Sequence, residues 1–197
     1  IIGYDMISVD NRYIPDNVIV DSNIDAESTL ESRRRELDTF IQENIEENSN
    51  YPYRVFPLID NPYSEATPAY FYPIVGGYTG AKLSIIQDVM YGGGPLDVQS
   101  QNFNPSVLDI LNVKYLTYGQ DLPLAGYEPV FESSRGTVYE NQNVLPKAFF
   151  VDSVITTQDP QKAFDYLMPG QINFAQTAVV ETSDNISAGS DSTSTVE

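Results

Sequence analysis

A glycine-rich turn is the feature of this sequence best suited to bind a ligand. Residues 76–80 read Gly-Gly-Tyr-Thr-Gly and come just before a helical pattern over residues 80–90. Backbone N–H groups at a helix N-terminus can hold a phosphate or sugar oxygen, and neighbouring tyrosines can stack on a sugar ring. The spacing matches neither the P-loop nor the dinucleotide-binding motif. A tight strand-to-helix turn surrounded by aromatic core residues is the alternative interpretation.

Two lysines also belong to the candidate site. Lys82 and Lys114 are rare bases in an acidic chain, and either can contact a phosphate as a point charge. The alternative is that each pairs with a carboxylate or lies at a helix end. With the turn and its aromatic neighbours, they complete the candidate ligand-binding residues: Tyr70, Tyr72, Gly76, Gly77, Tyr78, Lys82 and Lys114.

The acidic side chains do not indicate a catalytic or metal site by their spacing. Four of them lie close to the motifs described below: Asp60, Glu65, Asp88 and Asp109. Glycoside hydrolysis needs two carboxyl groups about 5–10 Å apart, and no spacing among these four selects a pair. Asp16, Asp21 and Asp25 lack the glycine and terminal glutamate of a calcium-binding loop. We therefore expect no catalytic residue, no metal and no cofactor.

Composition excludes further classes of function. The 197 residues include no Cys and no His, so thiolate catalysis, disulfides, Cys/His zinc sites and His-based triads are ruled out. The formal net charge of −18 argues against nucleic acid as a partner, because phosphate binding needs clustered Lys and Arg. Most of this charge lies on the flanks, since residues 51–150 carry nine acids and five bases.

Hydrophobic periodicity and turn residues predict alternating helices and strands. Helices are expected over residues 26–47, 80–90, 105–111 and 160–167. Strands are expected over residues 53–56, 113–118, 127–131, 136–140, 148–155 and 177–180. A turn at residues 133–136 makes one strand pair antiparallel, so the sheet is not all-parallel. The predicted fold class is mixed α+β, with a largely β-sheet core and a few packed helices in two or three layers.

The domain organisation follows from the distribution of these patterns. Residues 1–25 form an extended acidic lead-in, and residues 26–181 form one mixed α/β domain. The Ser-, Thr- and Asp-rich residues 182–197 lack periodicity and are expected to be disordered. No run approaches the roughly 20 apolar residues of a membrane helix, and the chain opens without Met or a signal peptide. We interpret it as a piece of a longer chain.

Three ordered sequence blocks resemble a signature of YfhO-type bacterial membrane proteins. The first, residues 70–88, leads from an aromatic pair through Gly-Gly-Tyr and Gly-Ala-Lys-Leu to Gln-Asp. Residues 107–116 and 138–151 are similar to two further blocks of that family, and residues 53–55 form a weaker match. This chain departs from the family pattern at Thr79 and at residues 84–86.

The resemblance implies an extracytoplasmic domain of a multi-spanning protein at the bacterial cell membrane. Such proteins are similar to cell-envelope glycosyltransferases that use a polyprenyl-phosphate sugar, and their catalytic carboxylate lies in a loop between early membrane helices. This chain lacks that loop, and residues 1–4 would follow a preceding span. Its implied partners are the transmembrane part of the same chain and a cell-envelope glycan or polyprenyl-phosphate sugar. A structural or interaction module without a ligand is the alternative, and a free-standing hydrolase is a third class.

Overall fold

The computed structural model describes residues 30–47, 53–78, 80–81, 83–184 and 186. The chain divides into two compact units, Ile1–Arg35 and Glu36–Glu197. The predicted lead-in over residues 1–25 lies outside the described residues, as does most of the predicted tail over residues 182–197. In the described end of the first unit, Arg34 Nε lies 2.7 Å from Glu31 Oε1.

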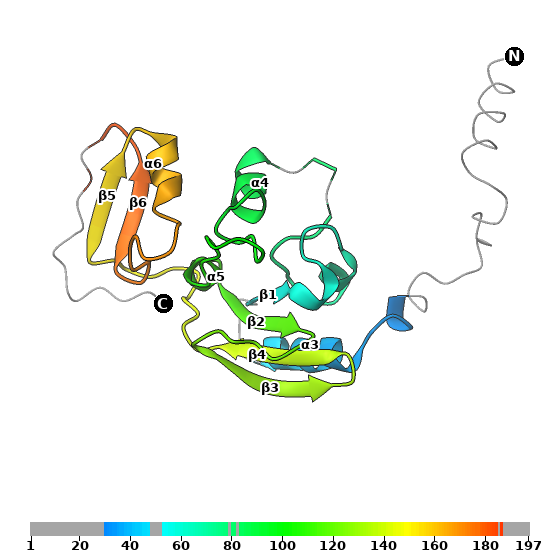
Figure 1. The fold of residues 1–197 in the computed structure, drawn as a ribbon. Coiled ribbons are helices and arrows are strands. Elements are labelled where there is room, and N and C mark those ends of the chain that lie inside the picture. Colours follow the sequence, from blue (N-terminus) through cyan, green and yellow to red (C-terminus); the bar gives the residue numbers. More distant parts are fainter. Residues whose placement is uncertain (1–29, 48–52, 79, 82, 185, 187–197) are drawn as a thin grey trace, which may run out of the picture. The chain divides into compact units, whose positions relative to one another are not determined.

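A four-stranded mixed sheet forms the centre of the second unit (Figure 1). Its strands are β1 (Arg54–Pro57), β2 (Val113–Tyr118), β3 (Tyr127–Ser133) and β4 (Gly136–Asn141). They lie in the order β1-β2-β4-β3, with β1 parallel to β2 and the other pairs antiparallel. This confirms the mixed α+β class, including the predicted antiparallel hairpin.

The connection between β1 and β2 carries most of the short helices, because parallel neighbours need a long crossover. Its helical segments are η2 (Leu58–Asp60), η3 (Thr67–Tyr70), α4 (Ser84–Met90) and α5 (Ser106–Ile110). The start of α5 follows from its sequence, since Pro105 suits a first turn and Asn104 Oδ1 accepts a hydrogen bond from Ser106 N at 3.2 Å.

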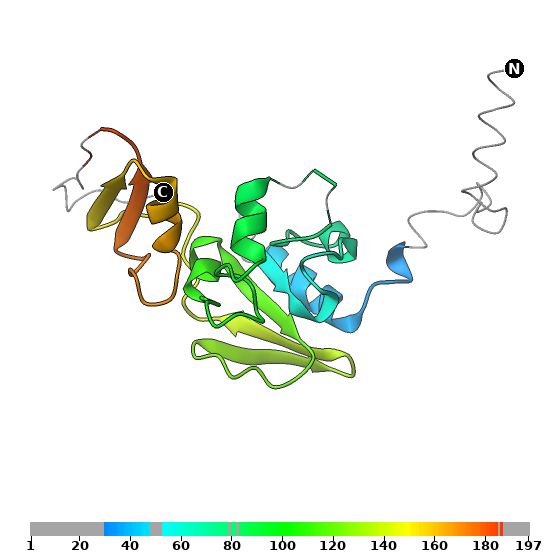
Figure 2. The same ribbon diagram turned by 45° about the horizontal axis from the view of Figure 1, so that its top comes forward.

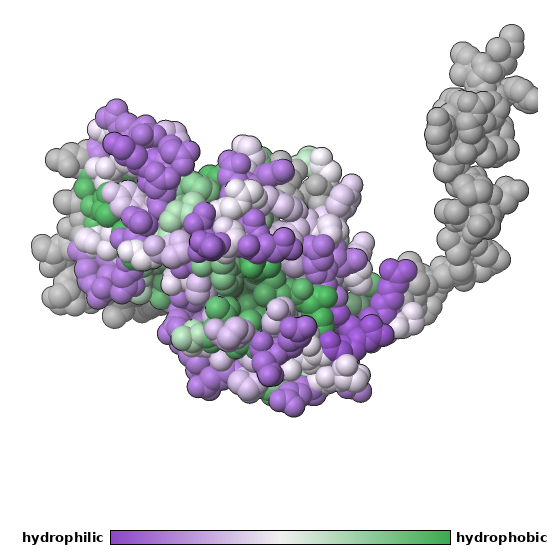
Figure 3. Space-filling model, viewed as in Figure 1, coloured by the Kyte–Doolittle hydropathy of each residue, from purple (hydrophilic) through white to green (hydrophobic). Residues whose placement is uncertain are grey.

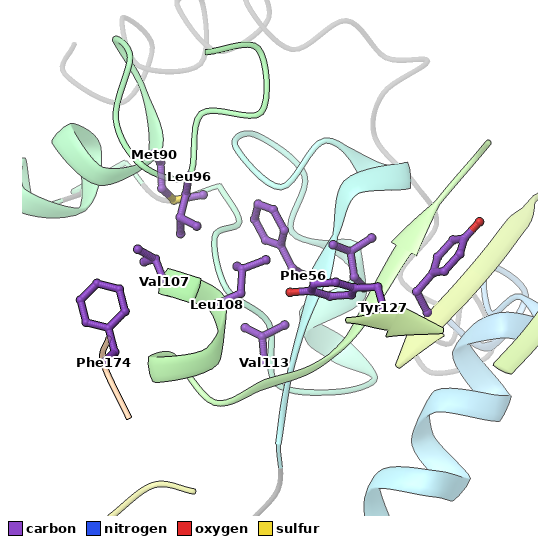
Figure 4. Close-up of a cluster of buried hydrophobic side chains, with 10 residues drawn as sticks. Phe56, Met90, Leu96, Val107, Leu108, Val113, Tyr127 and Phe174 are labelled. Carbon is purple, nitrogen blue, oxygen red and sulfur yellow. The ribbon is translucent and has the colours of Figure 1, made fainter. Parts of the chain in front are cut away.

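Apolar side chains are buried on both sides of this sheet. Helix α3 (Glu36–Glu47) packs against β3 and β4, and the Phe40 ring stacks on Phe131 with centroids 4.8 Å apart. A separate cluster joins α5 to the strands, with Leu108 and Phe56 fully buried (Figure 4). Both regions bury the apolar positions that the predicted periodicity places on one face of each element.

A second, smaller sheet follows in the chain. Strands β5 (Ser153–Thr157) and β6 (Thr177–Glu181) pair in parallel, and helix α6 (Pro160–Asp165) forms the crossover and lies against both (Figures 1 and 2). Asp159 caps α6, since its Oδ1 accepts a hydrogen bond from Gln161 N at 3.0 Å. The sequence predicted the helix and both strands but not their separation into a sheet of their own.

Three predicted elements differ from their sequence patterns, and residues 26–29 of the first lie outside the described residues. The predicted helix over residues 26–47 is interrupted by a turn at Ser32 and Arg33, and α3 begins at Glu36. Helix α4 begins at Ser84 rather than at Gly80, because Leu83 is extended and glycine is a poor helix former. The predicted strand over residues 148–155 is regular only from Ser153.

The exposed surface mixes polar and apolar residues. Figure 3 shows apolar residues gathered where β1 and β2 lie, with polar residues around them. Helix α4 buries Met90, whereas Ile85 and Ile86 remain exposed, so the predicted apolar face of this helix is only partly covered. Among the described residues, none of the helices has the length and apolar content needed to cross a bilayer.

Candidate functional site

The Gly76–Gly77 turn packs against the chain's own backbone. Both residues have positive φ, at 103° and 92°, which favours glycine. Gly77 N donates a hydrogen bond to Pro62 O at 2.7 Å, and a Cβ at Gly76 would overlap the same carbonyl. Since α4 begins only at Ser84, the turn does not form a helix N-terminus. The expected helix start at this turn was therefore wrong, and ligand binding by Gly76 and Gly77 stays a prediction.

The three candidate tyrosines occupy different environments. Tyr70 and Tyr78 are 72% and 70% exposed, whereas Tyr72 is only 4% exposed. The Tyr72 hydroxyl donates a hydrogen bond of 2.8 Å to Oδ1 of Asp38, a carboxylate of α3 that is itself buried. Tyr72 thus joins the 62–78 segment to α3, and its ring is not available to stack on a sugar.

Removing the Tyr72 hydroxyl tests this structural role. We expect Tyr72→Phe to lower the free energy of unfolding by about 1–3 kcal/mol, because a buried carboxylate loses a hydrogen-bond donor. Tyr70→Phe is the matched control and is expected to change stability by less than about 0.5 kcal/mol. Urea denaturation of both variants provides the measurement. Equal stability of the two variants would contradict the role assigned to Tyr72.

Of the two candidate lysines, Lys114 lies within the described residues. Lys82 lies outside the described residues. Lys114 Nζ, on β2, lies 3.1 Å from Glu140 Oε1 of β4 and 5.1 Å from the centroid of the Tyr53 ring. This half-buried ion pair satisfies the Lys114 charge within the sheet, as the alternative interpretation of this lysine anticipates.

Tyr115 beside this ion pair gives a prediction for alkaline pH. Burial, and next the negative charge of Glu140, raise the pKa of Tyr115 to about 12. An unfolded tyrosine ionises near pH 10, so the native state keeps a proton that the unfolded state loses. We expect the free energy of unfolding to fall as pH rises from about 10 to 12, and to fall less in Tyr115→Phe. Equal slopes of stability against pH in the two proteins would contradict this assignment.

A cavity beside α5 has a different character from the predicted turn. Its volume is about 530 Å³, within the range of small-molecule sites. Its lining is mainly amide, hydroxyl and carboxyl groups together with one aromatic ring: Asn104, Ser106, Asp109, Asn143, Leu145, Gly170, Ile172, Asn173, Phe174 and Ala175. None of the predicted site residues that the structure describes lies in this lining, and its described residues include no Lys or Arg. We call this the α5 cavity.

Among the described residues, Asp109 is the only acid in the lining of the α5 cavity, and a residue of the sheet holds its carboxylate in place. Asn141, which is 2% exposed on β4, donates a hydrogen bond from Nδ2 to Asp109 Oδ1 at 2.7 Å. The same Nδ2 donates to Val113 O at 3.0 Å, and Asn141 Oδ1 accepts from Asn143 N at 2.9 Å. Burial raises the pKa of the Asp109 carboxyl, and the bond from Asn141 acts in the opposite direction.

Tyr127 adds an unusual buried group close to this carboxyl. The residue is 8% exposed, and its hydroxyl has no hydrogen-bond partner among the described residues. Burial, and then the negative charge of Asp109, raise the pKa of Tyr127. Asp109 therefore lies in a partly desolvated region in which further negative charge is disfavoured.

A second cavity, of about 600 Å³, lies between α4 and α6. Its lining includes the apolar side chains of Ile85, Phe164 and Met168, and one carboxylate, Asp88. Each of the two cavities thus contains one carboxylate, so neither provides the pair that glycoside hydrolysis requires. Within the described part of the chain, no three acidic side chains come close enough to hold a metal ion.

Among the other acids that lie near the motifs, Glu65 has a local structural role. Glu65 Oε1 accepts hydrogen bonds from Thr67 N at 2.8 Å and Thr67 Oγ1 at 2.6 Å, so it fixes the start of η3. The sequence alone does not select Asp109 from the four acids near the motifs, because its hydrogen-bond partner Asn141 is 32 residues away. One signal in the sequence that points to this contact is the position of Asn141 at the end of a predicted strand, because an amide buried there needs a hydrogen-bond partner.

Comparison with known proteins adds no family to these observations. The chain matches no family model, no curated protein and no solved structure.

Proposed function

We propose that this chain is an extracytoplasmic domain of a multi-spanning cell-envelope protein and binds a glycan for chemistry carried out elsewhere in that protein. On this proposal its partners are the transmembrane part of the same chain and an envelope glycan or a polyprenyl-phosphate sugar. The parent protein would be similar to glycosyltransferases that use lipid-linked sugars. The three sequence blocks that resemble YfhO-type proteins support the cellular setting.

The α5 cavity is the observation that carries the binding role. Amide and hydroxyl groups with a nearby phenyl ring are the usual means by which proteins bind polyhydroxylated ligands, because sugar hydroxyls both donate and accept hydrogen bonds. Ser106, Asn143 and Asn173 provide such groups, whereas Phe174 is buried in the hydrophobic cluster and only borders the cavity. A single carboxylate without a second acid favours binding over hydrolysis.

A structural or interaction module is the second candidate function. The observation in its favour is that several predicted site residues make contacts within the domain. Gly77 donates a hydrogen bond to Pro62, and Tyr72 donates one to Asp38. Lys114 forms an ion pair with Glu140. On this alternative the motif blocks serve folding, and no small ligand binds.

Titration of the purified chain separates the two candidates. Glycan binding predicts saturable shifts of backbone amide resonances on addition of neutral oligosaccharides or a short-chain polyprenyl-phosphate sugar. Incubation with a polyprenyl-phosphate sugar and an oligosaccharide acceptor is expected to give no transfer product. An unchanged spectrum with every ligand would contradict the proposal and favour the module. The sequence of the same gene on either side of this segment provides an independent check, since the proposal requires that it encode membrane spans.

A further inference from the structure

The α5 cavity has the chemistry of a site for an uncharged ring rather than for a phosphate. The described residues of its lining include no cationic side chain, and Asp109 adds an acidic one. Phosphate recognition needs Lys, Arg or several directed N–H groups, whereas a carboxylate nearby opposes it by charge repulsion. A lipid-linked donor would therefore not be held here by its phosphate group.

Two polar side chains of α5 remain available to a ligand. Ser106 and Asp109 are three residues apart on this helix and so share one face. The Ser106 hydroxyl makes no side-chain hydrogen bond within the described part of the chain, and only one Asp109 oxygen accepts the bond from Asn141. The second oxygen of Asp109 can accept from a ligand hydroxyl, while Ser106 can donate or accept.

Asn141 is the residue that orients this carboxylate. It is almost fully buried, and its side chain makes three hydrogen bonds, to Asp109, Val113 and Asn143. A donor this constrained keeps Asp109 in one orientation at the cavity and lowers the cost of ordering it on binding. Asn141 is a positioning residue, because it acts through Asp109 and does not line the cavity.

We propose that the α5 cavity binds one neutral sugar ring of a glycan, with Asp109 and Ser106 hydrogen-bonding its hydroxyls and Asn143 lining the same cavity. This inference depends on the proposed function and narrows it. The domain recognises the sugar portion of its ligand, not the polyprenyl phosphate. One hydrogen bond to the open Asp109 oxygen and one to the Ser106 hydroxyl provide selectivity among sugars that differ in hydroxyl orientation.

Calorimetric titration of the whole chain with glucose, galactose, mannose and N-acetylglucosamine tests the proposal. We expect at least one sugar to bind, and Asp109→Asn to weaken its affinity by tenfold or more. Asn can still accept the hydrogen bond from Asn141, but its amide nitrogen presents donors where the carboxylate accepted. Ser106→Ala is expected to weaken binding by about threefold to tenfold. Asp88→Asn, in the lining of the other cavity, is the matched control and should change affinity by less than twofold.

The outcomes separate this inference from the proposed function. Sugar binding that is unchanged in Asp109→Asn, with an unaltered melting temperature, would place the glycan elsewhere and overturn only the assignment to the α5 cavity. Binding of inorganic phosphate or methylammonium that depends on Asp109, without sugar binding, would overturn the class of ligand. Failure of all sugars, oligosaccharides and polyprenyl phosphate to bind would overturn the proposed function as well.

Discussion

Replacing Gly76 with alanine is expected to lower the free energy of unfolding by about 3 kcal/mol or more, which is a large part of the stability of an ordinary domain. Gly76 has a φ of +103°, where an L side chain is strained, and its added Cβ would overlap the Pro62 carbonyl and come within 2.9 Å of Met90 Cε. The Met90 side chain can move, but the Pro62 backbone is held by its bond to Gly77 N.

Two other glycines separate the causes of this effect. Gly92 has a φ of +64° with open space around it, so Gly92→Ala is expected to cost only the backbone strain, about 1 kcal/mol. Gly80 has neither positive φ nor neighbours within 4 Å, so Gly80→Ala should change stability by less than about 0.5 kcal/mol. Urea denaturation of the three variants is expected to rank them in this order. Equal stability of Gly76→Ala and Gly80→Ala would contradict the packing role of the turn.

Truncation of Phe56 is expected to have a comparable effect, for a different reason. Phe56 on β1 is fully buried in the cluster that joins α5 to the four-stranded sheet. Phe56→Ala should lower the free energy of unfolding by about 3–5 kcal/mol, because it removes apolar contact and leaves a cavity. The measurement is again urea denaturation.

Phe150 is the matched control for Phe56, since it is 62% exposed. Phe150→Ala should change stability by less than about 0.5 kcal/mol. A small effect of Phe56→Ala would mean that the cluster beneath α5 does not position Asp109, because Val107 and Leu108 on the same helix belong to that cluster.

Local patterns predicted much of this fold. Asn104 and Pro105 mark the start of α5, the alternation of residues 113–118 gives β2, and the turn at residues 133–136 gives the β3–β4 hairpin. In each case neighbouring residues determine the structure, so a short sequence window contains the information. The fold class followed correctly from these elements.

The features of the structure that the sequence did not predict depend on contacts between residues far apart in the chain. Asp38 lies in a helix with a strongly charged sequence, yet it is 1% exposed because Tyr72 reaches it from 34 residues away. The grouping of β5 and β6 into a separate sheet is likewise a matter of tertiary pairing, which strand propensity does not specify.

The surroundings of the candidate site residues could not be predicted from the sequence for the same reason. The Gly-Gly-Tyr turn has the composition of an anion-binding loop, but the Pro62 carbonyl occupies the Gly77 N–H, and no local pattern indicates that contact. From the sequence alone, Asp109 does not differ from other acids in predicted helices. In the structure, Asn141 and the residues around 170–175 lie beside it. Cavities are built from several segments, so their residues are only partly visible in a linear sequence.

Mapping of amide chemical shifts with a neutral sugar tests the central claim most directly. With the tightest-binding sugar of the calorimetric series, the largest shifts are expected at the lining of the α5 cavity, in particular at Ser106, Asp109, Asn143 and Phe174. Amides of Gly76, Gly77 and Tyr78 should remain unchanged, because that turn packs within the domain. Shifts confined to the Gly-Gly-Tyr turn, with none around α5, would contradict the account.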